Sequence, residues 1–200
     1  MSKSNNTTSL SVEERYQKME PHEHILALPD TYIGSIEEDS NTMWVLIDKM
    51  MYYKEINYIP GLYKIYDEIL VNSRDHSIRD NTCTEIRVSI NRDTGEITCM
   101  NNGQKGIPDK IHQNYNIYVP ELIFGNLLTS EQYHVKGKTV GGKNGYGAKL
   151  ANIFSTHFYV EVFDHTLKLL YKQDFYDNMY KIDPPKITKC NNKNSYTLIR

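Results

Sequence analysis

The spacing of apolar residues predicts a long helix over residues 62–78. Leu62, Ile65, Tyr66 and Ile69 recur at intervals of three or four residues, which places them on one helical face. The remaining faces are mainly polar or charged. We therefore expect an amphipathic helix with one side packed on the core.

Strict alternation predicts strands further along the chain. Ile86, Val88 and Ile90 alternate with polar residues, and Ile97 and Cys99 resume the alternation after the turn at 92–95. This pattern indicates an antiparallel hairpin. Similar patterns predict a second hairpin and further strands, over residues 42–47, 53–59, 158–163, 167–175 and 195–200.

Shorter helices complete the expected set of elements. We expect helices at 119–128, entered through Pro120, and at 148–154, while Pro21 should interrupt a helical segment over 13–28. Hairpins mixed with helices, without regular βαβ units, favour the α+β class. The polar N-terminus predicts a flexible arm over 1–15, and we expect residues 16–200 to form one domain.

Composition narrows the possible partners. The net charge of −2 and the pI of about 6.4 argue against a surface devoted mainly to nucleic-acid phosphates. Three widely spaced cysteines without a C-x-x-C pair predict reduced packing residues. His22 and His24 are two residues apart and do not share a helix face, so we expect structural roles for them rather than a metal site. No signal peptide or membrane-spanning run is visible, so no membrane partner is expected.

The first candidate for chemistry lies on the 62–78 helix. Glu68 and Asn72 are one turn apart on a shared face, and Asp75 and His76 follow one turn later. A carboxylate and an amide so placed can supply a general base and a ligand for Mg²⁺, which prefers hard oxygen ligands. The alternative is an ordinary solvated edge of an amphipathic helix.

The second candidate follows the predicted 97–102 strand. Asn102 is followed by Gly103 and Gly106, and glycine permits backbone geometries closed to other residues. A polar side chain at the strand end can read the edge of a base. The alternative is an ordinary glycine- and proline-containing loop.

The third candidate is a glycine-rich loop leading into the 148–154 helix, where free N–H groups favour phosphate. A Walker A loop is excluded because Ala148 separates Gly147 from Lys149. The alternative is a flexible surface loop. The candidate phosphate-binding residues are Gly142, Lys143, Asn144, Gly145, Tyr146, Gly147, Ala148 and Lys149.

The order and the amino-acid sequences of these segments resemble those of the N-terminal ATPase region of eukaryotic-type type IIA DNA topoisomerases. The resemblance runs from about Tyr16 to the end of the chain. It is carried by YQKMEPHEHILALPDTYIGS, PGLYKIYDEILVNSRD, NNGQKGIP, VPELIFGNLLTS, VGGKNGYGAKLANIFST and DPPKIT. It implies the GHKL (Bergerat) fold, in which a mixed, mostly antiparallel sheet packs on a layer of helices.

The resemblance also implies roles for single residues. Glu68 matches the general base that activates water, and Asn72 matches the Mg²⁺ ligand. Asn102 stands where the family reads adenine, and Ser130 where it contacts ribose and phosphate. The implied cofactors are ATP and Mg²⁺. Asp75, His76, Gly103, Gly106 and the residues from Gly142 to Lys149 complete the implied nucleotide site.

The implied activity is ATP-driven closure of a dimer gate for DNA double-strand passage. The implied partners are DNA, through the full-length enzyme, and a second copy of the chain, in the nucleus or in a host-cell compartment if the source is viral. The family's transducer and cleavage domains are absent from these residues, so we expect weak hydrolysis by the isolated chain. Departures from the family pattern at His76 and Glu131 keep a degenerate binding module open as an alternative, beside a mismatch-repair or chaperone ATPase.

Overall fold

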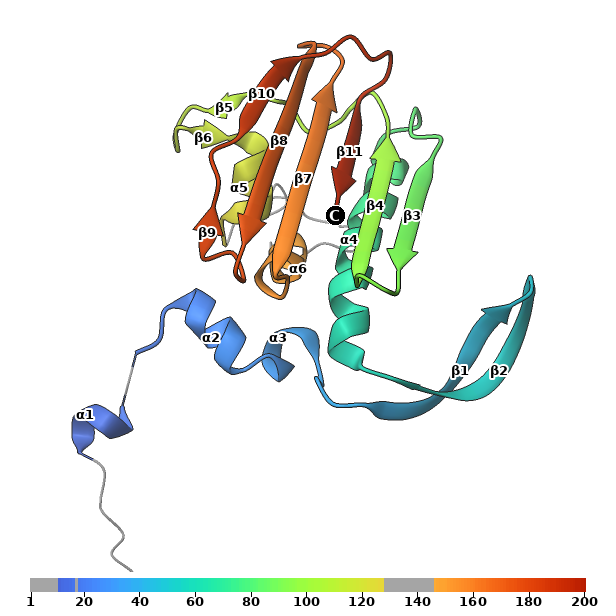
Figure 1. The fold of residues 1–200 in the computed structure, drawn as a ribbon, viewed down its shortest axis with the longest axis vertical. Coiled ribbons are helices and arrows are strands. Elements are labelled where there is room, and N and C mark those ends of the chain that lie inside the picture. Colours follow the sequence, from blue (N-terminus) through green and yellow to red (C-terminus); the bar gives the residue numbers. More distant parts are fainter. Residues whose placement is uncertain (1–10, 17, 128–145) are drawn as a thin grey trace, which may run out of the picture.

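The computed structural model describes residues 11–16, 18–127 and 146–200. Its main feature is a seven-stranded sheet in the order β10-β8-β7-β11-β4-β3, with β9 paired to β8 (Figure 1). The last strand of the chain lies inside this sheet, between β7 and β4. The strands are β3 (Ile86–Asn91), β4 (Glu96–Asn102), β7 (His157–Asp164), β8 (Leu169–Tyr176), β9 (Lys181–Ile182), β10 (Lys186–Lys189) and β11 (Tyr196–Ile199).

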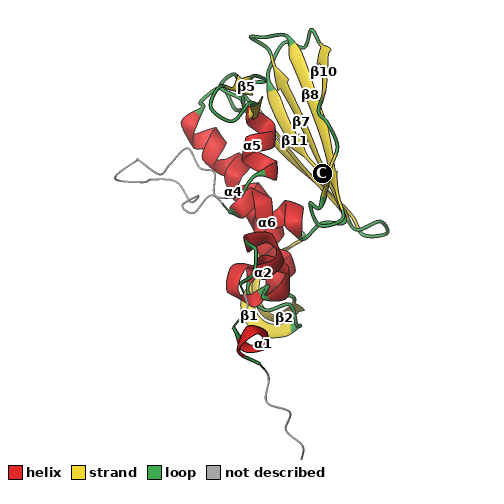
Figure 2. Ribbon diagram, turned by 90° about the vertical axis from the view of Figure 1, so that its left-hand side faces the viewer, coloured by secondary structure: helices red, strands yellow, loops and turns green. Residues whose placement is uncertain are grey.

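A layer of helices covers one face of the sheet. Figure 2 shows α4 (Pro60–Arg79), α5 (Val119–Gly125) and α6 (Gly147–Ile153) together on one side of the strands. α4 is the predicted long helix, and it begins at Pro60 because proline is tolerated in a first turn. The two-layer α+β architecture is therefore confirmed. Within the described residues every strand pairing is antiparallel, in keeping with the expected mostly antiparallel sheet.

The segment before α4 forms three short helices and a separate hairpin. The helices are α1 (Val12–Arg15), α2 (Pro21–Ala27) and α3 (Asp30–Ile33). As predicted, the helical segment over 13–28 is interrupted at Pro21: α1 ends at Arg15, and α2 begins at Pro21, where the missing N–H of proline is not needed. Two histidines on α2 make structural contacts: His22 Nε2 lies 2.7 Å from the Asn178 carbonyl oxygen, and His24 Nδ1 lies 2.8 Å from the Tyr32 hydroxyl.

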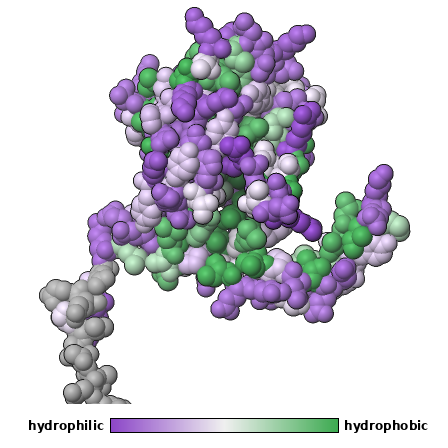
Figure 3. All heavy atoms as spheres, viewed as in Figure 1, coloured by the Kyte–Doolittle hydropathy of each residue, from purple (hydrophilic) through white to green (hydrophobic). Residues whose placement is uncertain are grey.

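The hairpin of β1 (Asp39–Ile47) and β2 (Met50–Tyr58) extends away from the sheet and its helices (Figure 1). Its strands were predicted over shorter ranges, and Asp48 and Lys49 form its turn with positive φ. Figure 3 shows apolar residues exposed along this arm. The most exposed large side chains there are Trp44, Leu46, Met50 and Tyr53, at 62–66%.

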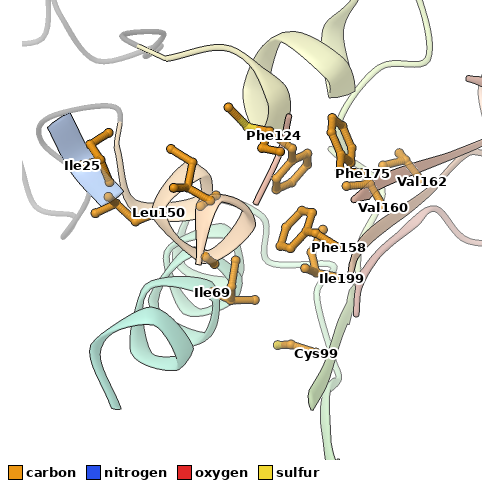
Figure 4. Packing of buried hydrophobic residues seen from close by; sticks show 14 of the residues in the cluster. Ile25, Ile69, Cys99, Phe124, Leu150, Phe158, Val160, Val162, Phe175 and Ile199 are labelled. Atoms are coloured by element: carbon orange, nitrogen blue, oxygen red, sulfur yellow. The ribbon is translucent and has the colours of Figure 1, made fainter. Parts of the chain in front are cut away.

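The core lies between the sheet and the helix layer. Phe124 of α5 lies beside Phe158 of β7, whereas Leu150 of α6 lies on the side of that helix that faces Ile25 of α2 (Figure 4). Burial of these large apolar side chains supplies the main driving force for docking the helices. The three cysteines are free, and Cys99 is buried in this core, as predicted.

Several small elements had no clear sequence signal. The pair β5 (Ile111–His112) and β6 (Ile117–Tyr118) has two residues per strand, as does β9. Segments this short carry no measurable periodicity. None of the helices in the described ranges is both long and apolar enough to span a bilayer.

A buried carboxyl group, Asp109, lies between β4 and β5. It is 2% exposed, and no hydrogen bond of good geometry reaches its oxygens in the described part of the chain, although the backbone of Asp164 and Tyr171 lies near enough to favour its charged form slightly. Burial, and then the charge of Asp164, raise the pKa of Asp109 to about 7. The unfolded carboxyl has a pKa of about 3.9. Ionisation therefore favours the unfolded state increasingly from about pH 4 to pH 7, and the destabilisation is complete above that range.

Asp109→Asn is expected to stabilise the protein at pH 8 by roughly 2–4 kcal/mol, because the amide cannot ionise. At pH 4, where Asp109 is protonated in the fold, the substitution should have little effect. Urea unfolding at both pH values measures this difference. An equal effect at the two pH values would show that the charge of Asp109 has no part in it.

Candidate functional site

Helix α4 presents Glu68 and Asn72 one turn apart at the edge of the core. The Glu68 side chain is 21% exposed, whereas Asn72 is exposed to solvent. Ile69 and Ser73 of the same helix are buried against the core, which fixes the rotation of the helix. The predicted pairing of a carboxylate and an amide on one accessible face is therefore present.

The start of α6 lies directly against Glu68. A Cβ atom built on Gly147 would stand 2.0 Å from Glu68 Oε2 and 2.9 Å from its Cδ. Real Cβ atoms do not approach so closely, so residue 147 must be glycine if Glu68 keeps this position. The glycine-rich segment and the α4 carboxylate, 79 positions apart in the sequence, thus meet in space.

Next to Gly147, α6 contributes two buried side chains. Ala148 is 7% exposed and Lys149 is 4% exposed. Burial lowers the pKa of the Lys149 ammonium group to about 8. Before the helix, the Tyr146 ring lies 6.1 Å from the ring of Tyr32 on α3. Tyr146 therefore connects the site to the N-terminal helices.

At the end of β4 two adjacent asparagines, Asn101 and Asn102, lie on opposite faces of the strand. Asn102 is held by the neighbouring chain: its Oδ1 accepts hydrogen bonds from the backbone N–H groups of Thr84 and Glu85, at 2.9 and 3.0 Å. Its Nδ2 donates to the Thr84 hydroxyl at 3.0 Å. The amide group of Asn102 is thus committed to closing the segment before β3, which does not fit a base-reading role.

Asn101 lies on the opposite face of β4, toward the helix layer. It shares this face with Cys99, two residues earlier, whose Sγ is 3.3 Å from Ser73 Oγ of α4, and Asn101 is 7% exposed. The next glycine, Gly103, lies against His76 of α4. Asn101 therefore lies beside the turn of α4 that follows Asn72. It is a better candidate than Asn102 for the side chain that reads the edge of a base. The alternation after Cys99 already carried this signal in the sequence.

The two glycines after β4 differ in whether the structure could accept a side chain in their place. Gly103 has φ of +143°, and a Cβ there would lie 2.6 Å from both Asp80 Oδ2 and His76 Nε2. Gly106 has room for a methyl group, since a Cβ would meet only Ser195 Cβ at 3.4 Å. Gly103 is therefore required by backbone conformation and close approach, whereas Gly106 is not.

His76 and Asp80 form a buried unit under Gly103. Their Nε2 and Oδ2 atoms are 3.6 Å apart, and burial lowers the pKa of His76. Asp80, for which the sequence carries no clear signal, accepts hydrogen bonds from the Thr82 hydroxyl at 2.6 Å and the Lys105 N–H at 2.8 Å. Although burial alone would raise it, these bonds hold the pKa of Asp80 well below its usual range. Asp80 therefore anchors the loop after β4 to the end of α4.

The remaining predicted residues divide into two groups. Asp75 is 7% exposed, so its carboxylate belongs to the interior side of α4. Five predicted residues lie outside the described ranges, namely Ser130, Gly142, Lys143, Asn144 and Gly145. The structure thus brings Glu68 of α4 against Gly147 of α6, with Asn72 one turn further along α4 and Lys149 two residues further along α6, while Asn101 lies on the adjacent strand β4.

The chemistry of this donor set fits a magnesium nucleotide. Asn72 offers an amide oxygen on an accessible face, and Mg²⁺ commonly takes only one or two protein ligands beside phosphate and water. Gly147 leaves a position without a side chain beside a carboxylate, where the backbone can approach a phosphate. The Glu68 carboxylate can accept a proton from a water molecule held there.

Comparisons with known proteins agree with this reading. No family model matches the chain. The chain is 51% identical over 205 residues to a protein of Acanthamoeba polyphaga mimivirus named DNA topoisomerase 2, covering 99% of the chain and 16% of the viral protein. The chain therefore spans well under two thirds of this relative's length.

Solved structures show the same similarity. The ATPase region of Saccharomyces cerevisiae topoisomerase II superposes with a TM-score of 0.89 at 46% identity, over 92% of this chain and 50% of the yeast chain. The 43K ATPase domain of Thermus thermophilus gyrase B superposes with a TM-score of 0.62 at 22% identity, over 89% of this chain and 38% of the other. The second match shows the fold alone. The chain belongs to the eukaryotic-type DNA topoisomerase II family, in which it corresponds to the GHKL-fold part of the ATPase region.

Proposed function

We propose that this chain binds ATP with Mg²⁺ and contributes the hydrolytic site of a type II DNA topoisomerase. The observation that carries the proposal is the contact between Glu68 Oε2 and Gly147, which places a basic oxygen against the start of the glycine-rich segment. In this proposal Glu68 takes the proton of the attacking water. Asn72 holds Mg²⁺, which when bound neutralises charge on the triphosphate.

We propose further that ATP binding closes a gate between two copies of the chain and drives passage of one DNA duplex through another. The support is the family membership and the resemblance of the segments given above. The DNA contacts would come mainly from other parts of the enzyme, in keeping with the net charge of −2. The nucleus, or a host-cell compartment for a viral protein, is the proposed location.

The adjacent asparagines test the nucleotide site directly. Asn101→Ala is expected to weaken ATP binding at least tenfold, because a site built to hydrogen-bond a base loses its partner. Asn102→Ala should leave ATP affinity within about twofold of the wild type and should instead lower the melting temperature, since Thr84 and Glu85 lose their partner. Calorimetric titration with a non-hydrolysable ATP analogue and thermal unfolding measure the two effects. The reverse pattern, with affinity lost only in Asn102→Ala, would contradict the assignment of Asn101.

The pKa of Lys149 gives ATP binding a pH dependence. Below about pH 8 the buried side chain is an ammonium group that can attract phosphate, and above it the free protein carries a neutral amine. Affinity for ATP is therefore expected to fall as the pH rises from 8 to 9.5, by up to about tenfold per unit, because binding must then take up a proton. Lys149→Met should bind more weakly and with no such slope. An identical slope in Lys149→Met would assign the titration to another group.

A further inference from the structure

Lys64 contacts the proposed catalytic carboxylate from one turn earlier on α4. Its Nζ lies 2.6 Å from Glu68 Oε1, and 3.8 Å from Asp67 Oδ2. The hydrogen bond to Glu68 is the main reason that the pKa of Lys64 is raised. Lys64 was not singled out from the sequence, because lysines on the polar face of a helix are common.

Helix stability does not account well for this ion pair. In an i,i+4 pair the acidic residue stabilises a helix better when it precedes the basic residue, and here the lysine comes first. The Lys64 side chain is also 42% exposed, so its ion pair is expected to contribute little to folding. A contact of 2.6 Å that adds little to stability can instead serve to hold the Glu68 carboxylate in place.

The contact divides the two oxygens of the Glu68 carboxylate. Oε1 is bonded to Lys64, whereas Oε2 faces Gly147 at the start of α6. Since the carboxylate is rigid, a hydrogen bond to Oε1 limits the positions that Oε2 can take. Lys64 and Gly147 therefore act on opposite oxygens and together restrict the rotation of the group.

We propose that Lys64 is a positioning residue that holds Glu68 with Oε2 directed at the attacking water. The inference rests on the proposed function of Glu68. In the reaction, the water oxygen bonds to the γ-phosphorus as the bond from that phosphorus to the β–γ bridging oxygen breaks. ADP leaves with that electron pair, and the proton of the water moves to Glu68 Oε2. Without Lys64 the carboxylate can rotate, and misplacement by about 1 Å can cost on the order of 100-fold in rate.

The test measures ATP affinity and the rate of ATP turnover separately, in the wild-type intact enzyme and in its variants. Lys64→Met keeps much of the side-chain length but removes the charge and the donors. It is expected to lower kcat by about 10- to 100-fold while the dissociation constant for a non-hydrolysable ATP analogue stays within about twofold. Lys64→Arg, which can also bond a carboxylate, should recover most of the lost kcat. Asp67→Asn is the matched control, because it removes the other carboxylate near Lys64 and should leave both quantities unchanged.

Each other outcome has a defined meaning. A weaker ATP affinity with unchanged kcat would assign Lys64 to nucleotide binding and overturn the positioning role. Unchanged kcat in Lys64→Met would overturn it as well, provided that Glu68→Gln abolishes turnover in the same preparation. If turnover does not depend on Glu68 at all, the proposed function itself fails, and that result is distinguishable from failure of the Lys64 inference.

Discussion

Glu68→Gln is expected to reduce ATP hydrolysis by about 10²- to 10⁴-fold, the usual contribution of a general base. The amide keeps the size of the side chain but cannot accept the proton of water at neutral pH. ATP binding should remain, because the phosphates are proposed to be held by other groups, and loss of the negative charge can only reduce repulsion. Steady-state phosphate release and equilibrium binding of ATP measure the two quantities.

The neighbouring carboxylate provides the control for this result. Asp67→Asn makes the same chemical change one residue earlier, on a side chain that is 29% exposed and is not among the nearest neighbours of a Cβ at Gly147. It should hydrolyse ATP at the wild-type rate. Comparable loss in Asp67→Asn and Glu68→Gln would point to general loss of charge on α4 and not to a base.

The second large effect is expected from Gly147→Ala. The added methyl group would lie 2.0 Å from Glu68 Oε2, so the carboxylate must swing away. Because that oxygen is the end of a flexible side chain, the cost in folding stability should be small, about 1 kcal/mol. Turnover should nevertheless fall about 100-fold, since the base loses its position. Thermal unfolding and ATPase assays of the same preparation separate the two effects.

A double variant shows whether the clash is the cause. In Glu68→Ala the obstructing carboxylate is absent, so adding Gly147→Ala should cost no further stability. Gly95→Ala is the backbone control: its Cβ meets nothing within 4 Å, although φ of +71° adds some strain. Equal destabilisation by Gly147→Ala in both backgrounds would place its effect elsewhere in α6.

The elements with long periodic patterns were predictable from the sequence. The α4 stripe and the alternations of β3, β4, β7 and β8 each span six or more residues, enough for a period to be read. The place of β11 between β7 and β4 was not predictable, because strand order depends on contacts between distant segments. The break at Pro21 was predictable, because proline lacks the N–H that a helix interior needs and is tolerated only in a first turn.

The candidate site was predictable as a set of residue types but not as a set of contacts. Glu68 and Asn72 share a face by helical spacing alone. The alternation after Cys99 points to Asn101, but the hydrogen bonds that commit Asn102 to Thr84 and Glu85 are visible only in the structure. The role of Gly147 depends on its distance from Glu68 on the neighbouring helix, and the role of Lys64 depends on its distance from Glu68 one turn away. No sequence pattern encodes either distance.

The most direct test of the central claim is a crystal structure of the protein with Mg²⁺ and a non-hydrolysable ATP analogue. The account predicts that Asn72 Oδ1 coordinates the metal and that Asn101 bonds the adenine. It also predicts a water molecule within hydrogen-bond distance of both Glu68 Oε2 and the γ-phosphate. An analogue bound away from the contact of α4 with Gly147, with Glu68 out of reach of the γ-phosphate, would contradict it.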